Sequence, residues 1–287
     1  MRQLRFRWPG SLAGICCLWA ALAFLQSGPA WAGFDEGVAA WERGDFSAAL
    51  RELRPLAEKG HATAQLIVGA VYTSGEGVPK DYKEAVKWFR QSAEQGNAGA
   101  QFSLGLMYFE GQGVPKDYKE AVKWYRLAAE QGDSGAQFSL GRMYFEGQGV
   151  PQDNREATNW FLRAAEQGQK DAQAMLGAMY TSGEGVPKDD REAFKWYRLS
   201  AEQGMELAQY SLGLMYAKGQ GVTRDFVQAH LWFNLAEAQG VDKAREGRAF
   251  VARRMTPAQI AEAQRLAQEW RPRPKTSSDP DRSRVNR

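Results

Sequence analysis

The stretch AQFSLGLMYFEGQGVPKDYKEAVKWY, residues 100–125, decides the fold of this 287-residue chain because close copies of it recur at a fixed period of 36 residues. A repeat of this length is typical of a solenoid, in which each unit buries its apolar face only by stacking on its neighbours. The five units are residues 61–96, 97–132, 133–168, 169–204 and 205–240. Three features mark them: Ala64-Gln65, Ala100-Gln101, Ala136-Gln137, Ala172-Gln173 and Ala208-Gln209; Gly69, Gly105, Gly141, Gly177 and Gly213; Trp88, Trp124, Trp160, Trp196 and Trp232.

Each unit is predicted to consist of two helices, as residues 97–132 illustrate. Ala100, Leu104, Met107 and Tyr108 are spaced as the apolar stripe of an amphipathic helix. Gly105 lies beside this stripe, and a glycine inside a helix costs about 1 kcal/mol relative to alanine. Its recurrence therefore indicates a packing role, in which the missing side chain lets another helix approach closely.

A glycine-rich turn separates the two helices. Gly111 suits the left-handed conformation that ends a helix, and Pro115 prevents the first helix from continuing. Asp117 is predicted to cap the second helix, and Glu120 to return a bond to the cap. All five units contain this box, at Asp81/Glu84, Asp117/Glu120, Asp153/Glu156, Asp189/Glu192 and Asp225/Gln228. The sequence therefore predicts an all-α fold, a solenoid of two-helix repeats.

Residues 1–32 have the pattern of a secretory signal peptide. Three arginines, with no acidic residue among them, precede an apolar run from Leu12 to Leu25 that is short for a membrane span. Ala30-Trp31-Ala32 is a cleavage site with small residues where signal peptidase needs them. We therefore expect cleavage after Ala32, a mature chain without a transmembrane segment, and a periplasmic or secreted location. The alternative is an uncleaved N-terminal anchor.

The segments that flank the five units are predicted to close the solenoid. Residues 33–60 form tetratricopeptide-like half-units, in which a tight Gly44-Asp45 turn replaces the long loop. Residues 241–270 are predicted to form two capping helices, and Thr256, Pro257 and Gln259 have the spacing of a cap, a first helical residue and a capping box. Residues 271–287 form a basic tail that we expect to be disordered.

Charge and cysteine content argue against several functions. The chain has 37 basic and 34 acidic residues, and removing the three signal arginines leaves equal numbers. Residues 271–287 hold six basic and two acidic residues, so the folded body is slightly acidic and unsuited to nucleic acid. Both cysteines, Cys16 and Cys17, leave with the signal, so the mature chain has no disulfide and no cysteine metal ligand.

The phrase A-x-x-x-L-G-x-x-Y-x-x-G-x-G-V-P-x-D-x-x-x-A-x-x-W-[FY] resembles the Sel-one-like repeat family, long-loop relatives of the tetratricopeptide repeats. The second unit carries it on Ala100, Leu104, Gly105, Tyr108, Gly111, Gly113, Val114, Pro115, Asp117, Ala121, Trp124 and Tyr125. The last unit departs from it, with Thr223 in place of the proline and Glu237-Ala238 inverted. The resemblance implies a right-handed α/α superhelix of the secreted bacterial type that acts as an adaptor for protein assembly.

By the same resemblance, one face of each first helix lines a concave groove. The residues there differ between units, unlike the repeated core positions. An apolar patch edged by charges suits an extended peptide or a helix with apolar anchors. The alternative is that these aromatic side chains pack between neighbouring helices. The predicted partner-binding residues are Phe102, Leu106, Phe109, Glu110, Phe138, Arg142, Phe145, Glu146, Tyr210 and Leu214.

No catalytic motif stands out in the sequence. The two histidines, His61 and His230, fall in different units and have no recurrent partner. The Gly-x-Gly turns lack the third glycine and the preceding strand of a phosphate-binding loop. We therefore predict that the protein has no enzymatic activity, no cofactor and no metal site.

The predicted function is that of a non-enzymatic periplasmic or secreted scaffold or adaptor. It would bind a protein or peptide segment in its concave groove and regulate envelope signalling or assembly. Two alternatives stay open. One is recognition of peptidoglycan or another cell-wall glycan. The other is β-lactam hydrolysis, which is suggested by cysteine-rich relatives of the family.

Overall fold

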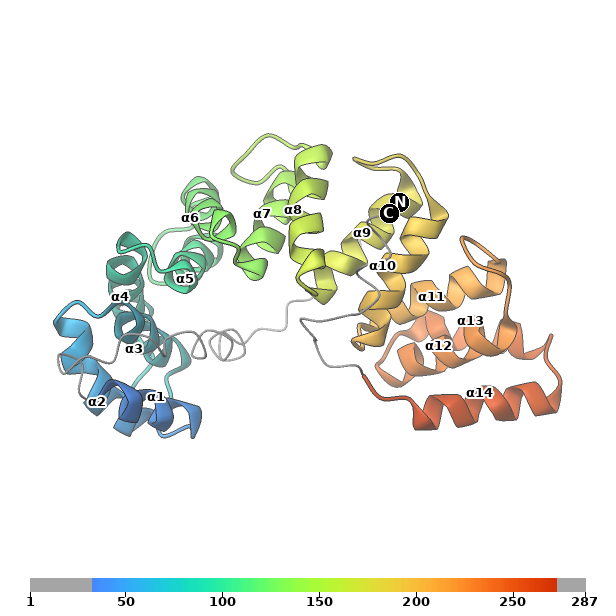
Figure 1. Ribbon diagram of the computed structural model, residues 1–287, viewed down its shortest axis with the longest axis horizontal. Coiled ribbons are helices and arrows are strands. Elements are labelled where there is room, and N and C mark those ends of the chain that lie inside the picture. The colour runs from blue at the N-terminus through green and yellow to red at the C-terminus, as the bar shows by residue number, and fades with distance from the viewer. Residues whose placement is uncertain (1–32, 273–287) are drawn as a thin grey trace. The chain divides into compact units, whose positions relative to one another are not determined.

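The computed structural model describes residues 33–272, and these residues form fourteen helices and no strand (Figure 1). The predicted signal peptide, its two cysteines and the tail beyond residue 272 lie outside the described residues. The all-α fold predicted from the sequence is confirmed, and each repeat contributes one pair of helices. We call the first helix of each pair an A helix and the second a B helix.

The helix bounds follow the 36-residue period. An N-terminal pair, α1 (Phe34–Glu42) and α2 (Phe46–Glu58), precedes the five units. The A helices are α3 (Ala62–Ser74), α5 (Ala98–Glu110), α7 (Ser134–Glu146), α9 (Lys170–Ser182) and α11 (Glu206–Lys218). The B helices are α4 (Tyr82–Glu94), α6 (Tyr118–Glu130), α8 (Asn154–Glu166), α10 (Asp190–Glu202) and α12 (Phe226–Ala238), and the chain continues through α13 (Asp242–Ala252) and α14 (Pro257–Glu269).

The chain divides into two compact units, with the boundary inside α7 between Ala136 and Gln137. In the first unit each helix packs on the next from α1 to α6. In the second unit the same order holds from α8 to α13, and α14 packs on α12. Each unit is therefore a stack of helix pairs with its own core, and the two are described separately below.

Local interactions end each A helix and start each B helix. Gly111 adopts a left-handed conformation (φ 75°) and donates its N–H to the Met107 carbonyl. The Asp117 N–H then bonds the Tyr108 carbonyl at 3.0 Å, which closes the loop. The Asp117 carboxylate accepts the N–H groups of the first turn of α6, so the predicted cap is confirmed. The same closing bond recurs at Asp81, Asp153, Asp189 and Asp225.

The glutamate half of the predicted capping box differs from the prediction. Glu84, Glu120 and Glu192 form ion pairs with the lysine three residues further along the helix. That lysine lies within reach on the same helix face and offers a full charge, whereas the cap offers a single backbone N–H. Only in α14, among the helices with described caps, do both halves form, between Thr256 and Gln259 as predicted.

The recurrent glycine inside each A helix receives an aromatic ring from its B helix. A side-chain carbon added at Gly105 would lie 2.7 Å from Cδ1 of Tyr125, closer than such atoms can approach. The same contact joins Gly69 to Phe89, Gly141 to Phe161, Gly177 to Tyr197 and Gly213 to Phe233. The packing role predicted for this glycine is confirmed, because the ring occupies the space that a side chain would need.

A relay of glutamine side chains joins successive repeats. Gln131, at the end of α6, donates to the side-chain oxygen of Gln101 on α5 at 2.7 Å. Gln101 in turn donates to the carbonyl of Ala93 at the end of α4, 3.2 Å away. Because Gln101 and the carbonyl are buried, the relay satisfies polar groups that would otherwise be costly inside the stack. Equivalent pairs form between Gln95 and Gln65, Gln167 and Gln137, Gln203 and Gln173, and Gln239 and Gln209.

In several repeats the second glycine of the long loop lies on the first turn of the preceding B helix. A side-chain carbon at Gly113 would lie 2.2 Å from the carbonyl oxygen of Tyr82, at the start of α4. Gly185 approaches the carbonyl of Asn154 and Gly221 that of Asp190 in the same way. The long loop therefore makes a contact between neighbouring repeats and also connects the two helices of its own repeat.

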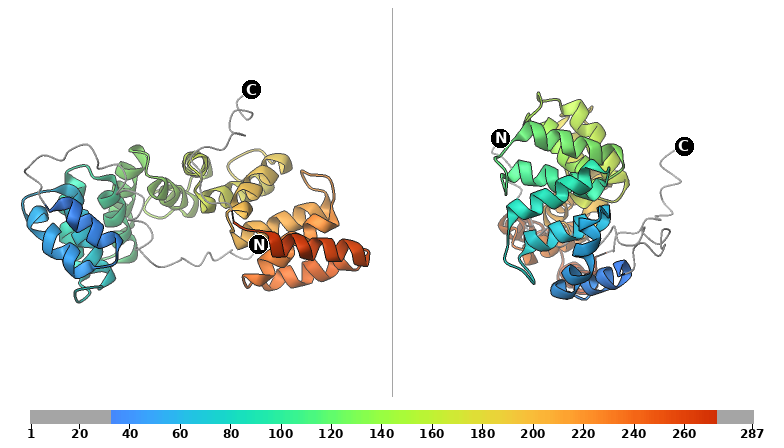
Figure 2. Two further views of the ribbon diagram at one scale, coloured as in Figure 1. Left: turned by 60° about the horizontal axis from the view of Figure 1, so that its bottom comes forward. Right: turned by 90° about the vertical axis from the view of Figure 1, so that its left-hand side faces the viewer.

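The C-terminal helices close the last repeat (Figure 2). Gly247 of α13 lies against the ring of Phe233, where an added carbon would be 2.8 Å from Cζ. After α14, the ring of Trp270 lies 6.3 Å from that of Trp232 in an edge-on arrangement. Trp270 and Pro272 also approach Gly204, at the turn between α10 and α11. The chain that leaves α14 is therefore anchored on the second unit.

Candidate partner-binding surface

The ten predicted partner-binding residues fall on three A helices. Four lie on α5 in the first unit, and six lie on α7 and α11 in the second unit. Because the two units are separate compact bodies, each set is considered within its own unit. Burial then separates the residues that can contact a partner from those that hold helices together.

In the first unit, two of the four residues are packing residues. Phe102 is 3% exposed and Leu106 is 2% exposed. The ring of Phe102 lies 5.7 Å from that of Tyr125, the aromatic that covers Gly105. Phe102 also lies against Gly135 at the start of α7. These contacts correspond to the alternative of packing between helices, and they leave Phe102 little area for a partner.

The other two residues of α5 lie nearer the surface. Phe109 is half-buried, and its ring lies 5.4 Å from that of Tyr118 at the start of α6. Glu110 is exposed as a residue, yet partial burial of its carboxyl raises the pKa, and Lys116 only partly offsets that effect. The end of α5 therefore presents an aromatic ring beside a carboxylate.

In the second unit, the predicted residues of α7 are half-buried or exposed. The ring of Phe138 lies 5.7 Å from that of Phe161 on α8, but Phe138 stays half-buried. Arg142 and Glu146 form an ion pair at 2.9 Å with side chains 22% and 35% exposed. Phe145 is half-buried between them in sequence. This helix offers two aromatic rings, one positive charge and one negative charge.

The predicted residues of α11 lie at the edge of the core of the last repeat. Tyr210 and Leu214 are half-buried, and the Tyr210 ring lies 5.8 Å from that of Phe233 on α12. Burial raises the pKa of the Tyr210 hydroxyl, and the negative charge of Glu246 raises it further. Tyr210 therefore stays a neutral hydrogen-bonding group at any physiological pH.

Between α7 and α11 in sequence, α9 carries small residues at the corresponding positions. Ala174 is buried, Ala178 is half-buried and Thr181 is exposed. The Tyr197 hydroxyl of α10 bonds the side chains of Thr181 and Ser211, and burial raises its pKa above the usual value although these bonds lower it. A surface of mostly apolar side chains with a few fixed polar groups is typical of peptide recognition.

One of the two histidines, His61, has a capping role that sequence reasoning missed. The Nδ1 of His61 accepts the N–H of Ala64 at 3.2 Å, so His61 is the N-cap of α3. Its ring stacks on Phe34 of α1 at 4.4 Å, and burial lowers its pKa. The sequence contained a clue to this cap, because Asn97 occupies the same position of the next repeat and caps α5. His230 is buried in α12.

The described residues show no other obvious chemical site. No group of three or more His, Cys, Asp or Glu side chains in the range 33–272 is placed to hold a metal ion. Among the same residues, no helix combines the length and hydropathy needed to cross a membrane.

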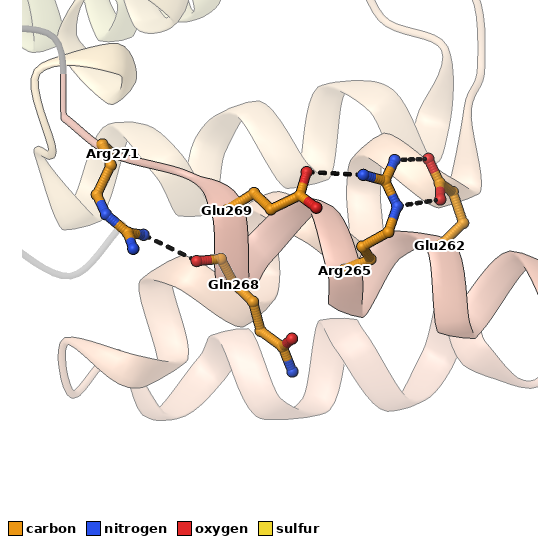
Figure 3. A network of polar contacts seen from close by, with 5 residues as sticks. All are labelled: Glu262, Arg265, Gln268, Glu269 and Arg271. Atoms are coloured by element: carbon orange, nitrogen blue, oxygen red, sulfur yellow. Dashed lines mark hydrogen bonds and ion pairs between the residues drawn. The ribbon is translucent and has the colours of Figure 1, made fainter.

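The charged cluster on α14 is a solvated helix face (Figure 3). Arg265 pairs with Glu262 and Glu269, each at 2.7 Å, and Arg271 donates to the carbonyl of Gln268 at 2.8 Å. Exposed pairs of this kind contribute little to stability because water screens them. The cluster closes the last turn of α14 and presents no converging groups for a substrate.

Repeated two-helix units, glycines covered by aromatic rings and long loops define a helical repeat protein, and comparison identifies its family. The Sel1 repeat model matches residues 62–97, 98–133, 134–169, 170–205 and 207–241, well over half of the chain. The protein therefore belongs to the Sel1 repeat family. Proteins of this family are commonly scaffolds for protein interaction.

Two solved structures are similar over most of the chain. A protective antigen present in uropathogenic Escherichia coli strains, which displays an SLR fold, is 40% identical with a TM-score of 0.75; the match covers 85% of this chain and 54% of that one. A Sel1 repeat protein from Oxalobacter formigenes is 32% identical with a TM-score of 0.71, and the match covers 85% and 98% of the two chains. This chain thus spans little more than half of the antigen's length. A comparison with curated protein sequences gave no match.

Proposed function

We propose that this protein is a periplasmic or secreted scaffold that binds a protein segment through the A-helix side chains of its second unit. The supporting observation is a contrast within the repeat. The glycine contacts, the glutamine relay and the caps recur in the repeats. The residues at the predicted partner-binding positions differ from one repeat to the next. Positions that vary on a fixed frame are available for recognition.

Burial favours the second unit as the place of contact. Phe138, Tyr210 and Leu214 keep part of their surface exposed, whereas Phe102 and Leu106 of the first unit do not. A partner segment with apolar side chains would gain by covering these groups, and aromatic residues are frequent anchors in interfaces. The Arg142–Glu146 pair would fix the segment's orientation, because either charge can exchange its partner for one on the ligand.

The test is photo-crosslinking of the mature protein in its own envelope fraction, followed by mass spectrometry. The diagnostic variant is Tyr210→Ala combined with Leu214→Ala, and the matched control is the buried Phe102→Ala. We expect the diagnostic variant to lose a defined crosslinked protein at temperatures where circular dichroism shows that it is still folded, although removing two side chains that pack on the core of the last repeat will lower its melting temperature. The control is expected to lower the melting temperature and, below that temperature, to keep the crosslink.

Other outcomes would contradict the proposal. Retention of the crosslinked protein by the diagnostic variant would remove the second unit from the contact. Pelleting of the protein with purified cell-wall sacculi, with no crosslinked protein, would favour glycan recognition instead. Turnover of a chromogenic β-lactam, abolished by one carboxylate substitution, would overturn the non-enzymatic assignment.

The proposed location rests on the sequence of residues 1–32. We expect the mature protein to begin at Gly33 and to be released with the periplasmic contents. N-terminal sequencing of the protein from fractionated cells tests this, and a chain that retains Ala30-Trp31-Ala32 in the membrane fraction would contradict it.

A further inference from the structure

The last repeat carries a histidine where the other repeats carry no ionisable group. His230 follows Ala229 in α12, and the four earlier units place Val86, Val122, Thr158 and Phe194 at this position. His230 is 1% exposed, and its Nδ1 is buried with no hydrogen-bond partner. A buried nitrogen without a partner is unfavourable, so its presence at a position that elsewhere accepts valine needs an explanation.

The surroundings of His230 disfavour a proton on its ring. Arg248 of α13 acts on the ring with a like charge, and burial acts in the same direction, so the pKa of His230 lies below its usual value. Glu237 of α12 acts the other way, but its carboxylate is engaged by Arg248 at 2.7 Å and by Arg245 at 3.1 Å. No charged group of α11 or α14, within the described chain, contributes to this balance.

The ring therefore lies where α12 meets the C-terminal helices. The α13 and α14 helices both pack on α12, and Gly247 brings α13 against the ring of Phe233. Arg248, the residue after Gly247, binds Glu237 across the same contact. A proton added to His230 would place a second positive charge beside Arg248 in a region that excludes water.

We propose that His230 makes the docking of α13 and α14 on the last repeat sensitive to pH. With a neutral ring the two helices stay docked. In mild acid the ring takes up a proton, and the charge is accommodated by release of α13 and α14, which exposes the ring to water. The α12 surface that these helices cover then becomes accessible.

Linkage fixes the sign and size of the effect. Because the docked form binds the proton more weakly than the released form, docking is strongest above the ordinary histidine pKa of 6.5 and weakens as the pH falls below it. Between pH 6.5 and the lower pKa of the docked form, a single proton changes the ratio of released to docked chain by at most about tenfold for each pH unit. The change stops once the docked form is protonated as well.

Hydrogen–deuterium exchange of the full mature chain tests the proposal, with rates corrected for the intrinsic effect of pH. The background is His61→Asn, which removes the only other imidazole and supplies the residue that Asn97 has at the same repeat position. In this background we compare His230 with His230→Val, the residue found at positions 86 and 122. His230→Thr, the residue of position 158, replaces the valine variant if that one does not fold.

The expected result is local. Between pH 7.5 and pH 5.5, protection of residues 242–269 should fall several-fold when His230 is present and should stay constant in the valine or threonine variant. Protection of α9 and α10 should not change with pH in either chain. Equal pH dependence in the two chains, or loss of protection that begins outside α13 and α14, would overturn the proposal.

Discussion

Two glycines with the same backbone conformation but different surroundings allow the contact between a long loop and the preceding repeat to be measured. Gly113 and Gly132 both have a positive φ, of 72° and 94°. A side-chain carbon at Gly132 meets no atom within 4 Å, whereas at Gly113 it would lie 2.2 Å from the carbonyl oxygen of Tyr82 and 2.5 Å from the carbonyl carbon. Gly132→Ala therefore introduces backbone strain alone. Gly113→Ala introduces the same strain together with a clash against α4 of the preceding repeat.

The two variants should differ by a measurable free energy. An alanine at positive φ costs about 1–2 kcal/mol at either position. The clash at Gly113 involves backbone atoms of the first turn of α4, which cannot rotate away as a side chain can. Overpacking of this kind adds about 1–3 kcal/mol, so Gly113→Ala should lower stability by about 2–5 kcal/mol. For Gly132→Ala the loss should stay at about 1–2 kcal/mol.

Urea unfolding followed by circular dichroism gives the overall order of stability. Long repeat arrays depart from two-state unfolding, so the midpoints are compared and the free energies are taken locally from hydrogen exchange. In Gly113→Ala the first turn of α4 should lose more protection from exchange than α6 does, because the backbone atoms that clash with the new side chain belong to α4. Equal losses in the two variants would refute the reasoning, since the clash would then contribute nothing.

Three further predictions concern single side chains. Gln101→Leu should lower the unfolding free energy by about 0.5–1.5 kcal/mol, because it removes one of the two donors to the buried Ala93 carbonyl, which keeps only the Gly96 N–H; a midpoint within error of the parent chain would contradict the relay. In a His230→Val background, His61→Asn should abolish the loss of stability expected as the pH falls below 6.5, because burial lowers the folded-state pKa of His61 and protonation removes the Nδ1 acceptor of its cap; parallel pH profiles of the two melting temperatures would refute this. Trp270→Ala should raise the exchange of α14 and leave α9 unchanged, because it removes the ring contact with Trp232; unchanged α14 would show that this anchor is dispensable.

The fold could be predicted from the sequence because its signals are local or strictly periodic. Gly111, Pro115 and Asp117 act on their own backbone, so their effects need no knowledge of the neighbouring units. The glutamine relay was not predicted although Gln101 and Gln131 recur visibly. The two glutamines lie thirty residues apart on different helices, the Ala93 carbonyl lies in the preceding repeat, and a period alone does not say which groups meet.

The candidate site could not be predicted to the same degree, and Phe102 and Phe138 show why. They are the same residue at the same repeat position, and each contacts the aromatic of its own B helix at 5.7 Å. Phe102 is nevertheless buried, whereas Phe138 is only half-buried. The residue that follows each of them by 33 positions differs: Gly135 lies against the ring of Phe102, and Asp171 replaces that glycine for Phe138. A glycine admits a ring against the next helix, whereas the half-buried Asp171, whose carboxylate accepts a hydrogen bond from the Gln169 side chain at 3.1 Å, adds a polar side chain at that position. Exposure of a repeat position therefore depends on the next unit, and a binding surface on such a protein has to be identified one unit at a time.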